Sequence, residues 1–209
     1  MKHIIPYTSF QEAIEAFDNG GKFFNLFSHA HDGVVSPAEL GKVAGVASDK
    51  QAMILYLVMS ISRLDNRSRE RVLARLDSHL FEIYEKYRPV HMSLDQLVER
   101  GKPGISATVV GIVKKISSST DMGGSIMVPV VVGAVTSFTM VPIENSYEVY
   151  ELRSTENEGV VMVAHHKEKE ALPERKLRIG GMITSLSQGE TTNQLNSVFL
   201  EAQFYMEED

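Results

Sequence analysis

The chain has no cysteine and no tryptophan among its 209 residues. Without cysteine it can form neither disulfides nor thiolate nucleophiles, and it cannot hold zinc or an iron–sulfur cluster through sulfur ligands. The lack of tryptophan removes one aromatic platform on which nucleic-acid bases stack. Any site in this chain must therefore be built from carboxylates, histidines, hydroxyls and cations.

An excess of positive charge is also missing. The chain carries 21 basic and 27 acidic residues, for a formal net charge of −6. Residues 1–100 hold 12 basic and 13 acidic residues, and residues 101–209 hold 9 and 14. This balance argues against a surface built throughout for nucleic acid, because proteins that bind nucleic acid gain affinity by neutralising its phosphates. A local basic patch stays open as an alternative.

Several sequence signals that would assign an activity or a cellular location are absent. There is no Gly-x-x-x-x-Gly-Lys-Ser/Thr phosphate loop, no Gly-x-Ser-x-Gly elbow and no His-Glu-x-x-His zinc pair. The first residues turn polar after Pro6 and lack the apolar core of a secretory signal. We therefore expect a cytoplasmic protein without a cofactor.

Residues 123–143 carry no charge and are about as long as a bilayer-spanning helix. Six valines and two threonines favour strands, and Pro129 would remove a helical hydrogen bond. The composition predicts a buried strand or hairpin, with a membrane-associated element as the alternative. If the segment is exposed, we expect a homo-oligomer to cover it.

The rhythm of apolar residues changes near residues 101–104, Gly-Lys-Pro-Gly, where a helix must stop. Helical spacing dominates before this point, and short β-branched runs follow it. The pattern predicts an α+β protein. We expect an α-helical bundle over residues 1–100 and an antiparallel β-barrel or sandwich over residues 101–209.

Capping residues mark where helices begin in the first half. Ser9, Ser36 and Ser48 each precede Glu or Gln by three residues, as in a capping box. The apolar stripes then predict helices over about 9–19, 23–27, 37–43, 49–63, 72–87 and 93–101. The helix at 49–63 is apolar on nearly every side, so we expect it at the centre of the bundle.

The second half reads as strands separated by Gly, Ser and Asn. The runs lie at 105–116, within 126–141, and at 147–152, 160–164, 177–186 and 198–205. The glycine-containing runs 107–116 and 176–184 resemble the first and fourth strands of an oligonucleotide/oligosaccharide-binding (OB) fold, in which glycine lets a strand bend around the barrel. The resemblance implies a five-stranded barrel with a recognition surface.

Residues 32–40 resemble the second half of an EF-hand calcium loop. In that register Asp32, Ser36 and Glu39 occupy ligand positions, while Ser28 and Ala30 supply no charge at the earlier ones. Two carboxylates are too few for ordinary calcium affinity. We therefore predict a degenerate EF-hand-like turn that caps a helix, and no metal site.

Four arginines in the first half, Arg63, Arg67, Arg71 and Arg75, are spaced four apart. On a continuous helix they would form a stripe suited to phosphates or an acidic partner. Alternatively, Leu64-Asp65-Asn66 breaks the helix, and the arginines pair with neighbouring acids.

A second candidate surface combines cations and tyrosines of the β-rich half. It consists of Lys114, Lys115, Lys176 and Arg178, with Tyr147 and Tyr150 for base stacking. Nearby acids such as Glu148 and Glu151 would oppose phosphates, so nucleic acid is a possible partner but not the favoured one.

We predict a non-enzymatic binding or adaptor protein. The β-rich domain would supply the recognition surface, and the helical domain would contact a protein partner or mediate self-association. One alternative is a single-stranded nucleic-acid-binding protein. Another is an enzyme with its site between the domains, using residues from the set His29, His31, Asp32, His165 and His166.

Overall fold

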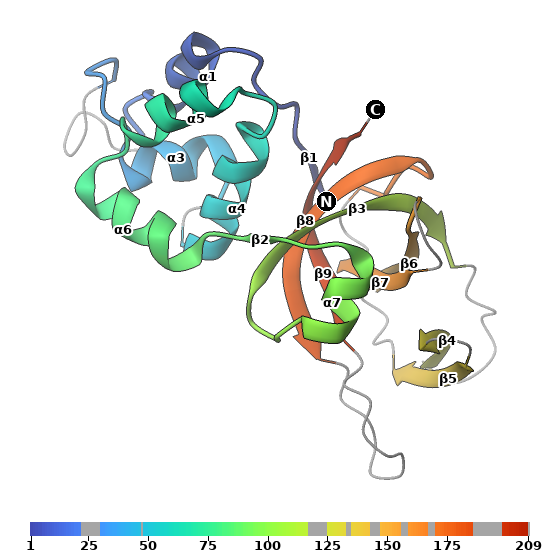
Figure 1. Ribbon diagram of the computed structural model, residues 1–209. Coiled ribbons are helices and arrows are strands. Elements are labelled where there is room, and N and C mark those ends of the chain that lie inside the picture. Colours follow the sequence, from blue (N-terminus) through green and yellow to red (C-terminus); the bar gives the residue numbers. More distant parts are fainter. Residues whose placement is uncertain are drawn as a thin grey trace. The chain divides into compact units, whose positions relative to one another are not determined.

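The chain divides into two compact units (Figure 1). The computed structural model describes residues 1–21, 30–46, 48–116, 125–132, 135–142, 147–155, 159–166, 170–185 and 198–208, with backbone only for 125–132, 135–142, 147 and 166. The helical unit comprises Ile4–Pro89, and the barrel unit comprises Met1–His3 and Val90–Asp209. The Gly-Lys-Pro-Gly segment at 101–104 therefore lies inside the barrel unit.

The described part of the helical unit contains five helices. They are α1 (Phe10–Phe17), α3 (Pro37–Ala44), α4 (Lys50–Ser60), α5 (Asn66–Leu73) and α6 (Ser78–Tyr87). Ile54, Leu55 and Leu57 of α4 are completely buried, as expected for a helix that is apolar on every side. The helix predicted at 23–27 lies outside the described residues.

Helix starts follow the predicted capping pattern with one exception. The Ser36 side chain and Glu39 form a complete capping box at α3. At α4 the cap is Asp49 rather than Ser48, because the Asp49 carboxylate accepts the Ala52 N–H at 2.9 Å. A carboxylate one residue later accepts from a backbone N–H of the first helical turn that has no acceptor within the helix. The predicted Ser48 capping box was therefore wrong by one position.

The helix predicted over residues 72–87 is two helices. Val35 pairs with Leu76 in an isolated bridge, and its N–H and C=O bond to Arg75 O at 2.7 Å and Asp77 N at 2.9 Å. Asp77 then caps α6 by accepting the Leu80 N–H at 2.6 Å. The apolar stripe runs through the break because both helices bury the same side, so periodicity alone could not reveal it.

The barrel unit contains one helix and nine strands among its described residues. Their bounds are β1 (Lys2–His3), β2 (Val90–His91), α7 (Leu94–Arg100), β3 (Ser106–Lys115), β4 (Ser125–Val132), β5 (Val135–Pro142), β6 (Tyr147–Arg153), β7 (Val160–His166), β8 (Lys176–Ser185) and β9 (Val198–Glu207). Every predicted strand is present. The two-residue strands β1 and β2 were not predicted.

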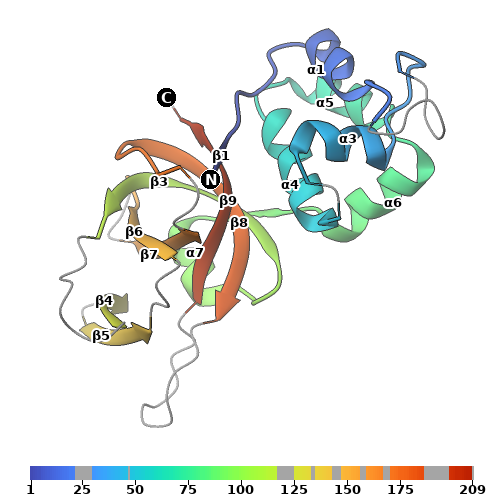
Figure 2. The ribbon, with the colours of Figure 1, turned by 180° about the vertical axis from the view of Figure 1, so that it is seen from behind.

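Five strands close into a ring in the order β3–β8–β9–β7–β6 and back to β3. All junctions are antiparallel except β7–β9, which is parallel, so the barrel is mixed rather than purely antiparallel. Figure 2 shows β8 and β9 as a long curved pair within this barrel. The closed ring is a barrel and not a sandwich, and it is consistent with the predicted OB-like architecture.

Side chains fill the barrel interior. Val109, Leu177, Ile179 and Leu200 are completely buried, and Leu97 of α7 belongs to the same core cluster. Gly181 allows the closure, because a Cβ there would lie 2.2 Å from the Glu201 carbonyl oxygen at a bulge between β8 and β9. This agrees with the role predicted for glycine in bending the strands.

The uncharged segment forms a hairpin, since β4 and β5 pair along their full lengths. This confirms the hairpin prediction. No helix in the described part of the chain has both the length and the apolar character needed to cross a bilayer.

Candidate functional site

A polar cluster closes one end of the barrel interior, with Glu148 at its centre. The Tyr150 hydroxyl donates to Glu148 Oε2 at 2.5 Å, and Lys115 Nζ lies 3.2 Å from Glu148 Oε1. His165 Nε2 lies 3.8 Å from Glu148 Oε2, and its ring stacks on Tyr150. The Leu172 N–H donates to the Tyr150 oxygen at 3.2 Å. Strand alternation places all four polar side chains on the inward face.

The cluster's electrostatics follow from these contacts. The hydrogen bond from Tyr150, followed by the bond and charge of Lys115, lowers the pKa of Glu148. Burial, together with the bond to Glu148, raises the pKa of Tyr150. Because Glu148 is held as an anion by Tyr150 and Lys115, the cluster stabilises the barrel end. Tyr150 is completely buried, so the predicted base-stacking role for it was wrong.

Three outward side chains of β6 and β7 are buried. Val149, Met162 and Ala164 alternate with core residues, so they point away from the interior, yet each is less than 9% exposed. In OB folds this face commonly contacts oligonucleotides. Here its described apolar side chains are covered within the chain itself.

The outward face of β6, β3 and β8 is open and cationic. Arg153, Ile112 and Lys176 form one row across the three strands, since Ile112 is in register with both neighbours. Lys114 lies two residues further along β3, and Arg178 two residues further along β8, on the same face. We call these five residues the cationic face. Ile112 at its centre is 45% exposed.

Arg153 and Arg178 of this face are each paired with a carboxylate. Arg153 contacts Glu151 Oε2 through Nε at 3.0 Å and Nη2 at 2.6 Å. Arg178 forms a two-point contact with Glu208, at 3.2 and 2.6 Å. Lys114 is exposed and forms no ion pair within the described residues. Lys114 therefore gives the face a positive charge that pairs with no carboxylate of the described residues.

The structure thus separates the predicted barrel set. Lys114, Lys176 and Arg178 share the cationic face, whereas Lys115 has the opposite parity and points to Glu148. The side chain of Tyr147 lies outside the described residues. Arg153 joins the face but was not predicted, because its place depends on the β3–β6 register. The available signal was the alternation of side chains along β6, which puts Arg153 on the outward face.

The arginines of the helical unit do not lie on one helix. Asp65 caps α5, so Arg63 precedes the helix and Arg75 follows it, which is the broken-helix alternative. Arg71 lies over the Phe10 ring at 3.8 Å, and Arg75 Nη1 donates to Gly33 O at 3.3 Å. Arg67 is exposed on α5. The continuous-helix alternative does not hold, because the chain turns at residues 61–65 before α5 begins.

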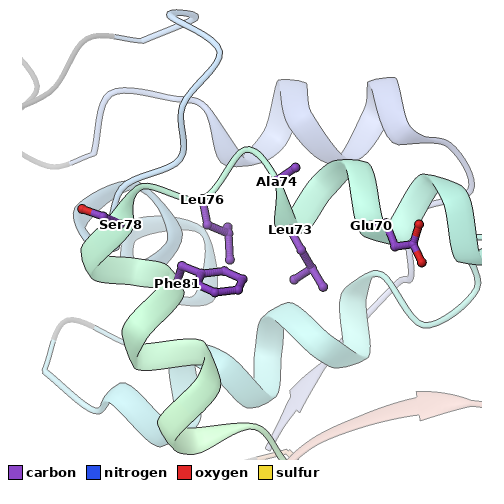
Figure 3. Close-up of a pocket in the computed structure, with 6 residues that line it drawn as sticks. All are labelled: Glu70, Leu73, Ala74, Leu76, Ser78 and Phe81. Atoms are coloured by element: carbon purple, nitrogen blue, oxygen red, sulfur yellow. The ribbon is translucent and has the colours of Figure 1, made fainter.

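An open groove of about 450 Å³ lies between α5 and α6 (Figure 3). Leu73, Leu76 and Phe81 line its apolar part, and the Phe81 side chain is 44% exposed. Glu70 lies at one end of the groove in Figure 3. This groove is a candidate surface of the described part of the helical unit, and no sequence pattern predicted it.

The EF-hand-like segment uses its oxygens within the protein. Glu39 Oε1 accepts from Gly20 N at 2.6 Å, and Glu39 Oε2 accepts from Ser36 N and Oγ at 2.8 Å. Asp32 Oδ1 accepts from Val34 N at 2.9 Å. Neither the structure nor any family motif supports an EF-hand. No three His, Asp or Glu side chains among the described residues are placed to hold a metal ion.

The histidines proposed for an enzyme are distributed over both units. His31 lies in an exposed turn of the helical unit, where its N–H donates to Asp18. His165 is buried inside the barrel. His29 and the side chain of His166 lie outside the described residues.

No protein-family model matches the chain, and no curated protein matches it either.

Proposed function

We propose that the protein is a non-enzymatic binding or adaptor protein that recognises its partner through the outer surface of an OB-like barrel. The observation that carries this proposal is the filled barrel interior, lined by Val109, Leu177, Ile179 and Leu200. A small barrel filled by its own side chains has no room for a ligand, so recognition must use the outside.

The order and directions of the five strands support the OB-like assignment. Three strands in sequence order, β3, β6 and β7, pair antiparallel, and the last strand, β9, closes the ring by running parallel to β7. The fold itself does not imply a function. The cationic face and the groove on the helical unit are the open surfaces from which an adaptor would work.

The experiment begins with proteins cross-linked to the full chain, each of which is then purified and titrated against it. We expect a complex to be reconstituted from the two purified components. Amide hydrogen exchange then shows which part is covered, and we expect protection within residues 90–185. Protection confined to residues 4–89, or no reconstituted complex, contradicts the proposal.

Single-stranded nucleic-acid binding is the second candidate, favoured by the cations on β3 and β8. The covered face of β6 and β7 and the acids Glu151 and Glu208 among those cations argue against it.

A further inference from the structure

We propose that the cationic face binds an acidic segment of a partner protein, with an apolar side chain of that segment resting on Ile112. This inference rests on the proposed function and names the surface and the chemistry of its partner. Register supplies the first argument, because Arg153, Ile112 and Lys176 form one continuous row across β6, β3 and β8. Side chains in directly paired positions of adjacent strands are close neighbours.

Charge supplies the second argument. The whole chain carries a formal charge of −6, yet this face gathers four cations, and Lys114 among them forms no ion pair within the described residues. Complementary charge steers a partner to a surface and excludes partners of the wrong sign. A local positive surface on an acidic protein therefore selects an acidic partner.

The exposed Ile112 decides between an acidic protein segment and a nucleic acid. Ile112 is a large apolar side chain at the centre of the cations, and it is 45% exposed. It offers contact area to a leucine or phenylalanine side chain. Base stacking needs an aromatic platform, and the cationic face contains no aromatic residue.

The test measures fluorescence anisotropy with a fluorescein-labelled peptide of about 16 residues, composed of glutamate with leucine at intervals. Lys114→Glu should weaken binding about tenfold, and Ile112→Ala about threefold. Lys86→Glu in α6 is the matched control, because it changes the net charge equally at an exposed site. It should leave the affinity within about twofold. Circular dichroism and thermal melting verify that each variant is folded.

Three results would overturn the inference. They are the absence of measurable peptide binding, equal losses in Lys114→Glu and Lys86→Glu, and tighter binding of a mixed single-stranded oligonucleotide than of the peptide. None of these is the failure of the proposed function, which is read from the reconstituted complex and its exchange protection. A complex that protects another barrel surface and tolerates Lys114→Glu would leave that function standing while the inference falls.

Discussion

Glu148 is the residue on which the polar end of the barrel depends. Its carboxylate accepts from Tyr150, pairs with Lys115 and lies 3.8 Å from the buried His165. An ionised group near the protein interior costs free energy unless charges and hydrogen bonds compensate it. At this scale the structure predicts large effects for small changes of the side chains around Glu148.

Tyr150→Phe removes one hydroxyl and two hydrogen bonds. The change takes a donor from Glu148 and leaves the buried Leu172 N–H without its acceptor, so the free energy of unfolding should fall by about 2 kcal/mol. Urea denaturation measures this loss. Tyr205→Phe is the control, because Tyr205 belongs to the same core and its hydroxyl forms no hydrogen bond within the described residues. Equal losses in the two variants would show that the hydroxyl contacts of Tyr150 contribute little.

The lowered pKa of Glu148 makes stability depend on pH. The hydrogen bond from Tyr150 and the charge of Lys115 place the folded-state pKa below the ordinary 4.5. The ionised form therefore stabilises the fold fully above that ordinary value, and this contribution is lost as the pH falls through the folded-state pKa. The difference in free energy of unfolding between the wild type and Glu148→Gln should be widest near neutral pH and narrow below about pH 4.

Urea titrations from about pH 7 to pH 3 test this pH dependence. The pKa values of Glu12 and Asp65 are also lowered, by hydrogen bonds from Thr8 and from Ser68 respectively. These groups titrate alike in both proteins, so the comparison cancels them. A constant difference over the whole range would contradict the assignment to Glu148.

Asp18 holds the turn at residues 31–33. Its carboxylate is 3% exposed and accepts from His31 N at 2.5 Å and from Gly33 N at 2.7 Å. Asp18→Asn replaces one acceptor oxygen with an NH₂ group, so we expect a loss of about 2 kcal/mol by thermal or urea unfolding. Asp32→Asn is the control, because an amide oxygen can still accept from Val34 N, and we expect a change within about 0.5 kcal/mol.

At the scale of elements, the β8–β9 pair shows how closely two strands can approach at a bulge. A Cβ at Gly181 would lie 2.2 Å from the Glu201 carbonyl oxygen, so Gly181→Ala forces the two backbones apart. We expect a loss of about 3 kcal/mol. Gly104→Ala separates this steric effect from backbone strain, because Gly104 has a φ of +84° and nothing within 4 Å of the added Cβ.

Chemical denaturation should give a loss near 1 kcal/mol for Gly104→Ala, which is the cost of a positive φ alone. A Gly181 variant no less stable than the Gly104 variant would mean that the bulge can relax around a methyl group.

At the scale of the whole molecule, charge distribution limits which partners the protein can bind. The chain has a net charge of −6, and Lys115, Arg153, Arg175 and Arg178 of the barrel unit are each paired with glutamates. A mixed single-stranded oligonucleotide should therefore bind weakly, with a small slope of log affinity against log salt. Anisotropy at about 50 and 200 mM salt measures the slope. Micromolar binding that falls steeply with salt would favour the nucleic-acid alternative instead.

Local signals predicted elements better than they predicted surfaces. Alternation of apolar residues predicted β3, β6, β7, β8 and β9, because each strand buries one face and its period is local. The same alternation puts Lys114, Lys176 and Arg178 on outward positions of their strands. Only the register shows that these positions lie on one face. Arg153 was missed because its place beside Ile112 depends on the β3–β6 register, whereas Tyr150 was misassigned although its alternation with the buried Leu152 puts it on the inward face.

The sequence by itself determined the change from helical to strand rhythm, the helix starts at Ser9, Ser36 and Ser93, and the strand positions, because these depend on neighbours a few residues away. Only the tertiary structure decided that five strands close into a ring, that Val35 divides one apolar stripe into α5 and α6, and that three separate strands bring their cations to Ile112. These features arise from pairing between residues far apart in the chain, and hydrophobic periodicity carries no information about which distant strands will meet.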